Sequence, residues 1–193
     1  MNLYVGLVHH PIRNKNDELV TTSVTNLDIH DIARSSRTFG AKNYYIVTPL
    51  KAQHELVNRI LGHWGEDKSA AYNPDRQDAL AISRVVDSVE DAMAQIEQQE
   101  GAPPLLAVTG ANFSEFSGTM DQLVAKMHFD KRPIFLIFGT GWGLHATLLE
   151  RADFKLDPIL GLASDGYNHL SVRSAVAIYL DRYARASESR PHS

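Results

Sequence analysis

The chain has 193 residues, 44% of them hydrophobic and 22% charged, the balance expected of one folded domain with its own core. It has no cysteine, which excludes disulfides, thiol catalysis and thiolate metal sites. The formal net charge is −4, whereas nucleic-acid-binding proteins are usually basic, so any such contact requires a local basic patch or a dimer groove. With no signal-peptide pattern and no apolar run long enough to span a membrane, we expect a cytoplasmic protein.

The N-terminal part of the chain alternates buried strands with amphipathic helices. The predicted elements are, in order, a strand at 3–9, a loop at 10–24, a helix at 26–40, a strand at 44–47 and a helix at 51–63. Asn26 or Asp28 is the expected N-cap of the first helix, and Gly40 ends it, where a positive φ is favoured. The second helix has Leu56, Ile60 and Leu61 on its apolar side. A strand, a helix and a strand in this order predict a parallel sheet.

The C-terminal part continues this alternation. The predicted helices lie at 78–83, 89–99 and 119–128, with a short one after residue 143. The predicted strands lie at 84–86, 105–108, 134–138 and 158–160. Asn168 is the expected N-cap of a final helix with one apolar face. We therefore predict a single α/β domain at residues 1–185, a mostly parallel sheet of five or six strands flanked by helices, and a disordered tail at 186–193.

Three small-residue loops follow three of the predicted strands. They are Thr109-Gly110-Ala111, the run Gly139 to Gly143, and the loop that starts at Gly161. Ligands of open α/β sheets bind beyond the carboxyl ends of the strands, so these loops should converge on one ligand site, although each alone could be a plain turn. The chain lacks a GxGxxG fingerprint near its first strand and a GxxxxGK[ST] phosphate loop, which disfavours NAD chemistry and nucleotide hydrolysis.

Three segments, in family order, resemble the motifs of the SPOUT RNA methyltransferases, especially a small single-domain bacterial branch. They are Asn26 to Gly40 (NLDIHDIARSSRTFG), Phe138 to Leu144 (FGTGWGL) and Leu170 to Ala175 (LSVRSA). The resemblance implies a C-terminal deep trefoil knot, S-adenosylmethionine bound in a bent shape within it, and a homodimer whose active site uses both subunits. The implied activity is methyl transfer to RNA, either tRNA or rRNA.

The resemblance also implies which residues hold the cofactor. They are Thr109, Gly110, Ala111, Gly139, Thr140, Gly141, Trp142, Gly143, Leu144, Leu160, Gly161, Tyr167, Asn168, His169, Leu170 and Ser171. Methyl transfer from a sulfonium is an in-line displacement, which requires positioning of the acceptor and removal of its proton rather than a metal. The nine histidines show no HExxH-type spacing, and we expect no metal site.

The expected catalytic residues lie on the first helix. Arg34 matches the arginine of the first motif and would position the acceptor or bind phosphate, and Asn26 and His30 are the other candidates. His30, Arg34 and Arg37 recur at helical spacing away from the apolar face and could line a cleft. On the residues alone, the alternatives are a solvated helix face with Asp31 paired to Arg34, and Asn26 acting only as a cap.

The sequence leaves the acceptor atom and its proton acceptor open. His169 is a second candidate proton acceptor, or else a capping or packing residue. Ribose-methylating relatives carry a Glu where this chain has Gly141 and an Asn where it has Ser171, so base and ribose both stay open. RNA contacts could come from the loops at 10–24 and 64–76, whose cations include Arg13, Lys15, Lys68 and Arg76.

Two other functions are compatible with the sequence. One is a non-catalytic, dimeric S-adenosylmethionine-binding module that serves as a sensor or partner protein. The other is a flavodoxin-like nucleotide binder without a knot, which would be monomeric. Salt-dependent retention of RNA would distinguish the methyltransferase from both.

Overall fold

The computed structural model describes residues 2–65 and 73–188. Its centre is a six-stranded, parallel sheet in the order β5-β4-β1-β7-β6-β8. The strands are β1 (Leu3–Val8), β4 (Tyr44–Val47), β5 (Ser83–Val86), β6 (Leu105–Val108), β7 (Ile134–Gly139) and β8 (Phe154–Lys155). An antiparallel hairpin follows β1 and consists of β2 (Ile12–Arg13) and β3 (Leu19–Val20). The predicted α/β class with a parallel sheet is confirmed.

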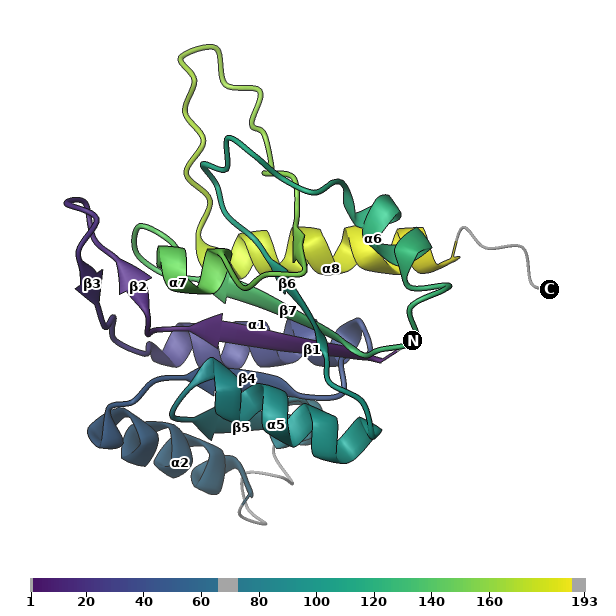
Figure 1. Cartoon of the computed structure of the whole chain (residues 1–193). Helices are drawn as coiled ribbons and strands as arrows, with labels where there is room; N and C mark the ends of the chain where they lie inside the picture. The colour runs from purple at the N-terminus through teal and green to yellow at the C-terminus, as the bar shows by residue number, and fades with distance from the viewer. Residues whose placement is uncertain (1, 66–72, 189–193) are drawn as a thin grey trace.

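Helices cover both faces of the sheet (Figure 1). They are α1 (Asn26–Thr38), α2 (Lys51–Gly65), α4 (Pro74–Ala81), α5 (Val89–Glu100), α6 (Met120–Lys126), α7 (Ala146–Leu149) and α8 (Val172–Glu188). One face packs against α1, α6 and α8 together with α2 and α4, and the other packs against α5 and α7. The segment between β8 and α8, green-yellow in Figure 1, projects away from the sheet. Within the described ranges, no helix is long and apolar enough to cross a membrane.

Side-chain alternation along the strands builds two apolar layers. In β1, Leu3, Val5 and Leu7 join the layer under α1 and α8, whereas Tyr4 and Val8 face α5 and α7. All six residues of β1 are buried, as expected of a central parallel strand that is covered on both faces. Its composition, rather than a polar–apolar alternation, therefore predicted this strand.

Helix α1 begins at a different cap from the predicted one. Its N-cap is Thr25, whose hydroxyl accepts a hydrogen bond from the Asp28 amide at 3.2 Å and donates one to Asp28 Oδ2 at 2.6 Å. Asn26 is the first helical residue, so the prediction of Asn26 or Asp28 as N-cap is wrong. Thr25 serves better because its hydroxyl reaches both the amide and the carboxylate of Asp28. Gly40 follows the helix with a φ of 74°, which confirms the predicted end.

The predicted strand at 158–160 is wrong. The strand β8 forms earlier, where Phe154 pairs with Ala107 and Lys155 pairs with Val108. Because β6 ends at Val108, the chain after β8 pairs instead with the segment before α6: Leu156 forms a single bridge with Gly118, and the Asp157 amide donates to Gly118 O at 3.0 Å. The pairing along this edge of the sheet thus reaches only Asp157. Residues 158–160 consequently have no regular secondary structure and are left to form part of a loop.

Helix α8 starts later than predicted. Its first residue is Val172, and the Ser171 hydroxyl accepts a hydrogen bond from the Ser174 amide at 3.2 Å. The prediction of Asn168 as N-cap is therefore wrong, since Ser171 lies at the position from which a side chain reaches the first turn.

Three helices differ from prediction in position, length or orientation. Helix α4 begins at Pro74, four residues before the predicted start at residue 78. Helix α8 runs to Glu188, so the first residues of the predicted tail at 186–193 are helical, and residues 189–193 lie outside the described part of the chain. In α2, the predicted Ile60 and Leu61 pack against the core, but Leu56 is 42% exposed and Val57 is buried in its place, so only the prediction for Leu56 is wrong.

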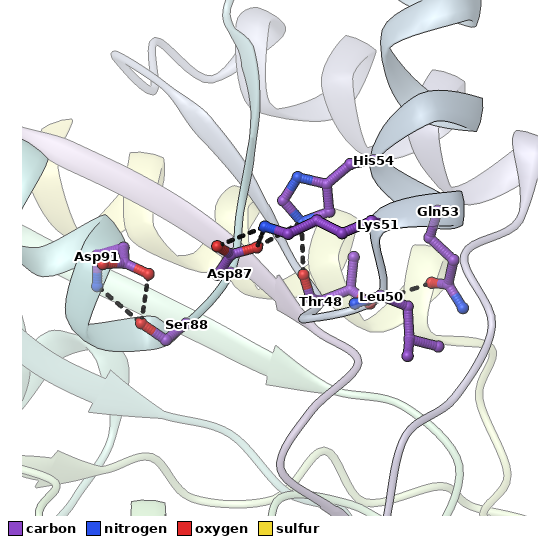
Figure 2. A network of polar contacts seen from close by, with 8 residues as sticks. All are labelled: Thr48, Leu50, Lys51, Gln53, His54, Asp87, Ser88 and Asp91. Atoms are coloured by element: carbon purple, nitrogen blue, oxygen red, sulfur yellow. Dashed lines mark hydrogen bonds and ion pairs between the residues drawn. The ribbon is translucent and has the colours of Figure 1, made fainter.

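Polar side chains connect the start of α2 to the neighbouring strand ends (Figure 2). Lys51 Nζ lies 2.6 Å from Asp87 Oδ1, beyond the end of β5. Gln53 accepts a hydrogen bond from the Val24 amide at 3.1 Å and donates one to the Thr22 carbonyl at 3.3 Å. The start of α2 thus fixes the segment that links β3 to α1.

Candidate functional site

The carboxyl ends of β6 and β7 open onto one cavity of about 840 Å³, the main cavity. It is lined by residues 109–115 after β6 and by residues 138–144, which are the end of β7 and the loop that follows. The segment before α8 adds Ile159, His169 and Leu170. The three predicted loops therefore converge, because parallel strands present their carboxyl ends at the same edge of a sheet. The volume lies in the range of small-molecule sites, roughly 300–1,000 Å³.

Most of the predicted cofactor residues line the main cavity. They are Thr109, Gly110, Ala111, Gly139, Thr140, Gly141, Trp142, Gly143, Leu144, His169 and Leu170. The other five lie outside its lining, and they are Leu160, Gly161, Tyr167, Asn168 and Ser171. Among these, Asn168 braces the loop, since its Nδ2 donates to Ile159 O at 2.9 Å and its Oδ1 accepts from the Gly161 amide at 3.0 Å. Asn168 thus holds Ile159 at the cavity wall.

The loop after β7 has a backbone that a ligand can approach closely. A Cβ at Gly139 would lie 2.8 Å from the Leu144 amide nitrogen, so a side chain does not fit there. Gly141 and Gly143 have φ values of 57° and 104°, which L-residues with side chains rarely adopt. Glycine satisfies both conditions without strain, which explains the run of glycines in this loop.

A chain of hydrogen bonds fixes this loop to the centre of the sheet. Thr140 Oγ1 donates to Val8 O at 3.1 Å. Thr22 Oγ1 lies 2.5 Å from Thr140 Oγ1 and 2.9 Å from His9 Nδ1. The Thr140 hydroxyl donates its proton to Val8 O, so in the contact with Thr22 it must accept, and the Thr22 hydroxyl is the donor. Thr22 then has no proton left for His9 and must accept from it, which places the imidazole proton on Nδ1. Burial lowers the pKa of His9 to about 4, so the ring is neutral at neutral pH, as this chain of bonds requires.

The β2–β3 hairpin forms a wall of the main cavity that the sequence did not predict. The Arg13 amide donates to Gly143 O at 3.1 Å, and Arg13 Nε donates to Trp142 O at 2.9 Å. Strands of two residues leave no periodic pattern, so the region had the character of a polar loop. Other lining residues that sequence reasoning missed are Thr22, Asp28, Phe113, Glu115, Lys155 and Tyr179.

The charged groups around the main cavity carry both signs. Arg13 and Lys155 are cationic, and Asp28 and Glu115 are anionic. This balance suits a small ligand that itself carries both kinds of charge. Among residues 2–65 and 73–188, no group of three or more His, Asp or Glu side chains is placed to hold a metal ion.

Helix α8 contributes an aromatic side chain to the main cavity. Tyr179 Oη donates to Asp157 O at 2.6 Å, and its ring centroid lies 5.9 Å from that of Phe138. Burial raises the pKa of Tyr179 to about 12, so the phenol stays protonated and keeps this hydrogen bond. Tyr179 therefore provides packing and a fixed donor rather than a base.

The predicted catalytic residues lie in a different place. Asn26, His30 and Arg34 come together in a second pocket of about 530 Å³, the basic pocket, which also contains Arg59, His63, Trp64 and Arg76. The opposite side of α1 faces the main cavity at its first turn, through Asp28 and the N-cap Thr25. Within one chain, the three predicted catalytic residues therefore lie together but apart from the predicted cofactor-binding loops.

Two expected neighbours of Arg34 have other partners. Arg37 Nε lies 2.8 Å from Asp78 Oδ2, so Arg37 pairs with α4 rather than lining the pocket. Asp31 Oδ2 lies 3.5 Å from Arg173 Nε, and Asp28 Oδ1 lies 3.1 Å from Arg173 Nη1. Arg173 on α8 thus holds the start of α1 from the side of the main cavity, and the alternative in which Asp31 pairs with Arg34 is wrong.

The match to known families covers nearly the whole chain. Residues 2–185 match the family described as SAM-dependent RNA methyltransferase. The chain belongs to this family. The chain is similar to proteins named tRNA (guanine-N(1)-)-methyltransferase from Oleidesulfovibrio alaskensis and Nitratidesulfovibrio vulgaris. The identities are 47% and 42%, in each case over 94% of this chain and 41% of the relative.

The chain spans about two fifths of the length of these two relatives. An uncharacterised protein of Aquifex aeolicus is 35% identical over 94% of this chain, and there the match covers 87% of the relative. The same unit therefore occurs both inside longer proteins and in a protein not much larger than the unit itself.

Solved structures share the fold of this chain at low sequence identity. A probable methylase family protein from Haemophilus influenzae has a TM-score of 0.60 at 19% identity, over 96% of this chain and 66% of that one. The SpoU methyltransferase AviRb from Streptomyces viridochromogenes, in complex with AdoMet, has a TM-score of 0.57 at 16% identity, over 99% and 59%. The Aquifex aeolicus TrmH/SpoU tRNA modifying enzyme has a TM-score of 0.56 at 17% identity, over 97% and 76%. These likenesses confirm the predicted resemblance to the SPOUT methyltransferases in fold.

Proposed function

We propose that this methyltransferase binds S-adenosylmethionine in the main cavity and transfers its methyl group to RNA as a homodimer. The observation that carries the proposal is the convergence of the loops after β6 and β7 with the segment before α8 on one cavity. The glycines of the loop at 139–143 leave backbone groups open to the cofactor, and the mixed charge of the lining suits its sulfonium and its amino-acid part. The knot and the cytoplasmic location remain part of the proposal.

The proposed reaction requires that the acceptor is oriented toward the methyl group and that a base takes the acceptor's proton. The acceptor atom of the RNA attacks the methyl carbon, the bond from that carbon to sulfur breaks, and S-adenosylhomocysteine leaves with the electron pair. Arg34 positions the acceptor or its phosphate, because a guanidinium holds its proton too firmly to serve as the base. His30 is the better candidate to take the acceptor's proton, since burial and the nearby Arg76 lower its pKa and favour the unprotonated ring.

A second copy of the chain would complete the site. Arg34 faces away from the main cavity of its own chain, so we propose that it acts at the cavity of the partner. Apolar side chains in and next to the projecting segment are exposed, as expected of a surface that a partner covers. They are Leu160, Leu162, Tyr167 and Leu170.

RNA is the proposed acceptor, with tRNA as the first candidate. The two longer relatives are named for tRNA guanine-N1 methylation, but more than half of each relative lies outside the match and could carry that activity. Bulk tRNA and ribosomal RNA should therefore both be offered with labelled S-adenosylmethionine. Nucleoside analysis would then distinguish a methylated base from a methylated ribose.

Titration calorimetry at a protein concentration where the solution mass is also measured tests the cofactor and the dimer. Wild type should bind S-adenosylmethionine as a dimer, and NAD and ATP should not bind. Gly139→Ala should weaken binding by more than about tenfold, because its methyl group collides with the loop backbone. Gly62→Ala is the matched control, since a Cβ there meets no atom within 4 Å. A folded dimer that binds no S-adenosylmethionine would refute the proposal.

Mixed dimers test whether Arg34 acts in the partner's site. Arg34→Ala and Gly139→Ala subunits, each inactive alone, should regain methyl transfer when they are co-assembled, because one of the two sites then has an intact cavity and an intact arginine. Failure to regain activity in verified mixed dimers would place Arg34 at its own cavity instead. A dimer that binds the cofactor but methylates neither RNA would favour the non-catalytic module.

A further inference from the structure

The basic pocket concentrates positive charge in an acidic chain. Three guanidinium groups meet there from three helices, namely Arg34 on α1, Arg59 on α2 and Arg76 on α4. The carboxylate Asp31 also lines the pocket, but it is shared with Arg173 at 3.5 Å. The formal net charge of the whole chain is −4, so this cluster is the kind of local basic patch that nucleic-acid binding by an acidic protein requires.

Several nitrogen atoms in the pocket lack a partner. Among the described residues, Arg34 and Arg59 make no hydrogen bond or ion pair. Arg76 Nε and His30 Nδ1 are buried and have no hydrogen-bond partner in the same part of the chain. Buried polar groups are nearly always satisfied in folded proteins, so Arg76 Nε and His30 Nδ1 indicate a ligand there, and the exposed Arg34 and Arg59 are free to donate to the same ligand.

Trp64 holds one of the three guanidinium groups in a fixed plane. The Arg76 Cζ atom lies 4.9 Å from the centroid of the Trp64 ring. The rings of His30 and His63 meet Trp64 edge-on, each with its centroid at 5.8 Å, and Trp64 itself packs against the core. A stacked guanidinium loses less freedom when it binds and presents its N–H groups in a fork that matches phosphate.

We propose that the basic pocket is a clamp for the phosphodiester backbone of the RNA acceptor, in which Arg59 and Arg76 bind phosphate beside Arg34. The inference rests on the proposed function, because the methyltransferase activity supplies RNA as the ligand. The backbone is the chosen target since guanidinium groups are donors only and suit phosphate oxygens, whose binding carries no sequence information. Arg59 and Arg76 therefore position the RNA, and the base or ribose to be methylated is selected elsewhere.

Binding of RNA as a function of salt tests the clamp. The probes are a fluorescent single-stranded RNA of mixed sequence and bulk tRNA, measured with the full chain in the absence of cofactor. Each phosphate contact in single-stranded RNA contributes roughly 0.7 to the slope of log affinity against log salt, so three contacts give a slope of about −2. Arg59→Gln and Arg76→Gln should each lower affinity by about tenfold and reduce the slope by about 0.7.

Two further variants separate a built clamp from general charge. Arg76→Lys keeps the charge but loses the stacked fork, so it should retain the slope and still lose affinity. Arg151→Gln removes a guanidinium that pairs with Glu90 on another part of the surface, and it should leave RNA binding unchanged. Affinity and slope that stay at the wild-type values in both glutamine variants would overturn the clamp, as would a wild type that binds neither RNA.

The outcomes also distinguish the clamp from the proposed function. S-adenosylmethionine affinity should be the same in all these variants, because the residues changed lie outside the main cavity. Methyl transfer that persists unchanged in Arg59→Gln and Arg76→Gln would overturn the clamp and leave the methyltransferase intact. A wild type that does not bind S-adenosylmethionine would instead overturn the main-cavity proposal. The RNA-binding measurements would then still show whether the basic pocket binds the RNA backbone.

Discussion

The main cavity and the basic pocket, on opposite sides of α1, are lined by different kinds of protein group. The main cavity is lined largely by loop backbone and small residues, and hydrogen bonds from the hairpin and from Thr140 fix its glycine loop. The basic pocket is lined by long charged and aromatic side chains on three helices, and Arg34 and Arg59 are exposed. A fixed backbone suits one small molecule of constant shape, whereas long side chains adjust to a polyanion whose contacts vary.

The difference between the cavities also concerns what holds them in place. On the side of the main cavity, α1 is joined to α8 by Arg173 and Asp28, whose side chains are 32% and 10% exposed. On the side of the basic pocket, α1 is joined to α4 by Arg37 and Asp78, whose side chains are 50% and 60% exposed. We expect the first contact to contribute to stability and the second to contribute little, because solvent screens an exposed ion pair.

The strongest test of the comparison is Arg34→Ala. If the basic pocket serves the acceptor and the main cavity serves the cofactor, this change should lower the rate of methyl transfer by at least about a hundredfold and leave S-adenosylmethionine affinity unchanged. Single-turnover transfer to RNA and calorimetry measure the two quantities on the same preparation. Arg34→Lys is the control, because it keeps the charge without the guanidinium fork. A loss of cofactor affinity equal to the loss of rate would break the division between the two cavities.

A second test concerns the buried support of the main cavity, His9. The pKa of His9 is 6.5 in the unfolded chain and about 4 in the folded one, so the unfolded state binds more protons between these values. The free energy of unfolding should therefore fall as the pH is lowered from 6.5 to 4, with His9 contributing about 3 kcal/mol of that loss.

Urea unfolding across this pH range measures the effect of His9. His9→Gln has no imidazole to protonate, so its stability should depend less on pH than that of the wild type. Equal pH dependence in the two proteins would mean that His9 is accessible to protons in the folded state, and the chain of hydrogen bonds from His9 to Thr140 would have to be abandoned.

A smaller loss is expected from Arg173→Met. This change leaves Asp28 with 10% of its side chain exposed and without its cationic partner, which should lower the free energy of unfolding by about 2 kcal/mol. Denaturant unfolding at neutral pH measures the loss. Asp28→Asn combined with Arg173→Met should recover part of the stability, because the buried charge is then gone. No recovery would mean that Arg173 acts through packing of its aliphatic stem.

The smallest effect is expected from Arg37→Met. Arg37 and Asp78 form an exposed ion pair, so the free energy of unfolding should fall by less than about 1 kcal/mol. The same denaturant experiment gives the value, and Arg173→Met is the matched comparison, as each change removes an α1 ion pair. A loss as large as that of Arg173→Met would show that the two sides of α1 are supported equally.

Local signals in the sequence were enough for most of the fold. The apolar runs of β1, β4, β6 and β7 predicted the central strands of the sheet, and Gly40 predicted the end of α1. The glycines of 139–143 predicted a loop whose backbone a ligand can approach closely. The structure agrees for Gly139, where a Cβ would collide with the loop backbone. Strand β8 and the hairpin escaped prediction because pairs of residues have no period, and their existence depends on neighbours far along the chain.

For the candidate site too, the sequence predicted some features and only the structure showed the others. The residue types of the loops at 109–111 and 139–144 predicted a cofactor cavity, and the motif around Arg34 resembled a catalytic segment. Only the tertiary structure decided that Arg34 lies on the side of α1 away from the main cavity and that the hairpin forms one wall of that cavity. It also decided that Arg59 and Arg76 join Arg34 from two other helices. The sequence determined the local conformations because side-chain size and backbone freedom are properties of single residues. The crossing of helices far apart in the chain decided which side chains meet, because that depends on packing across the whole core.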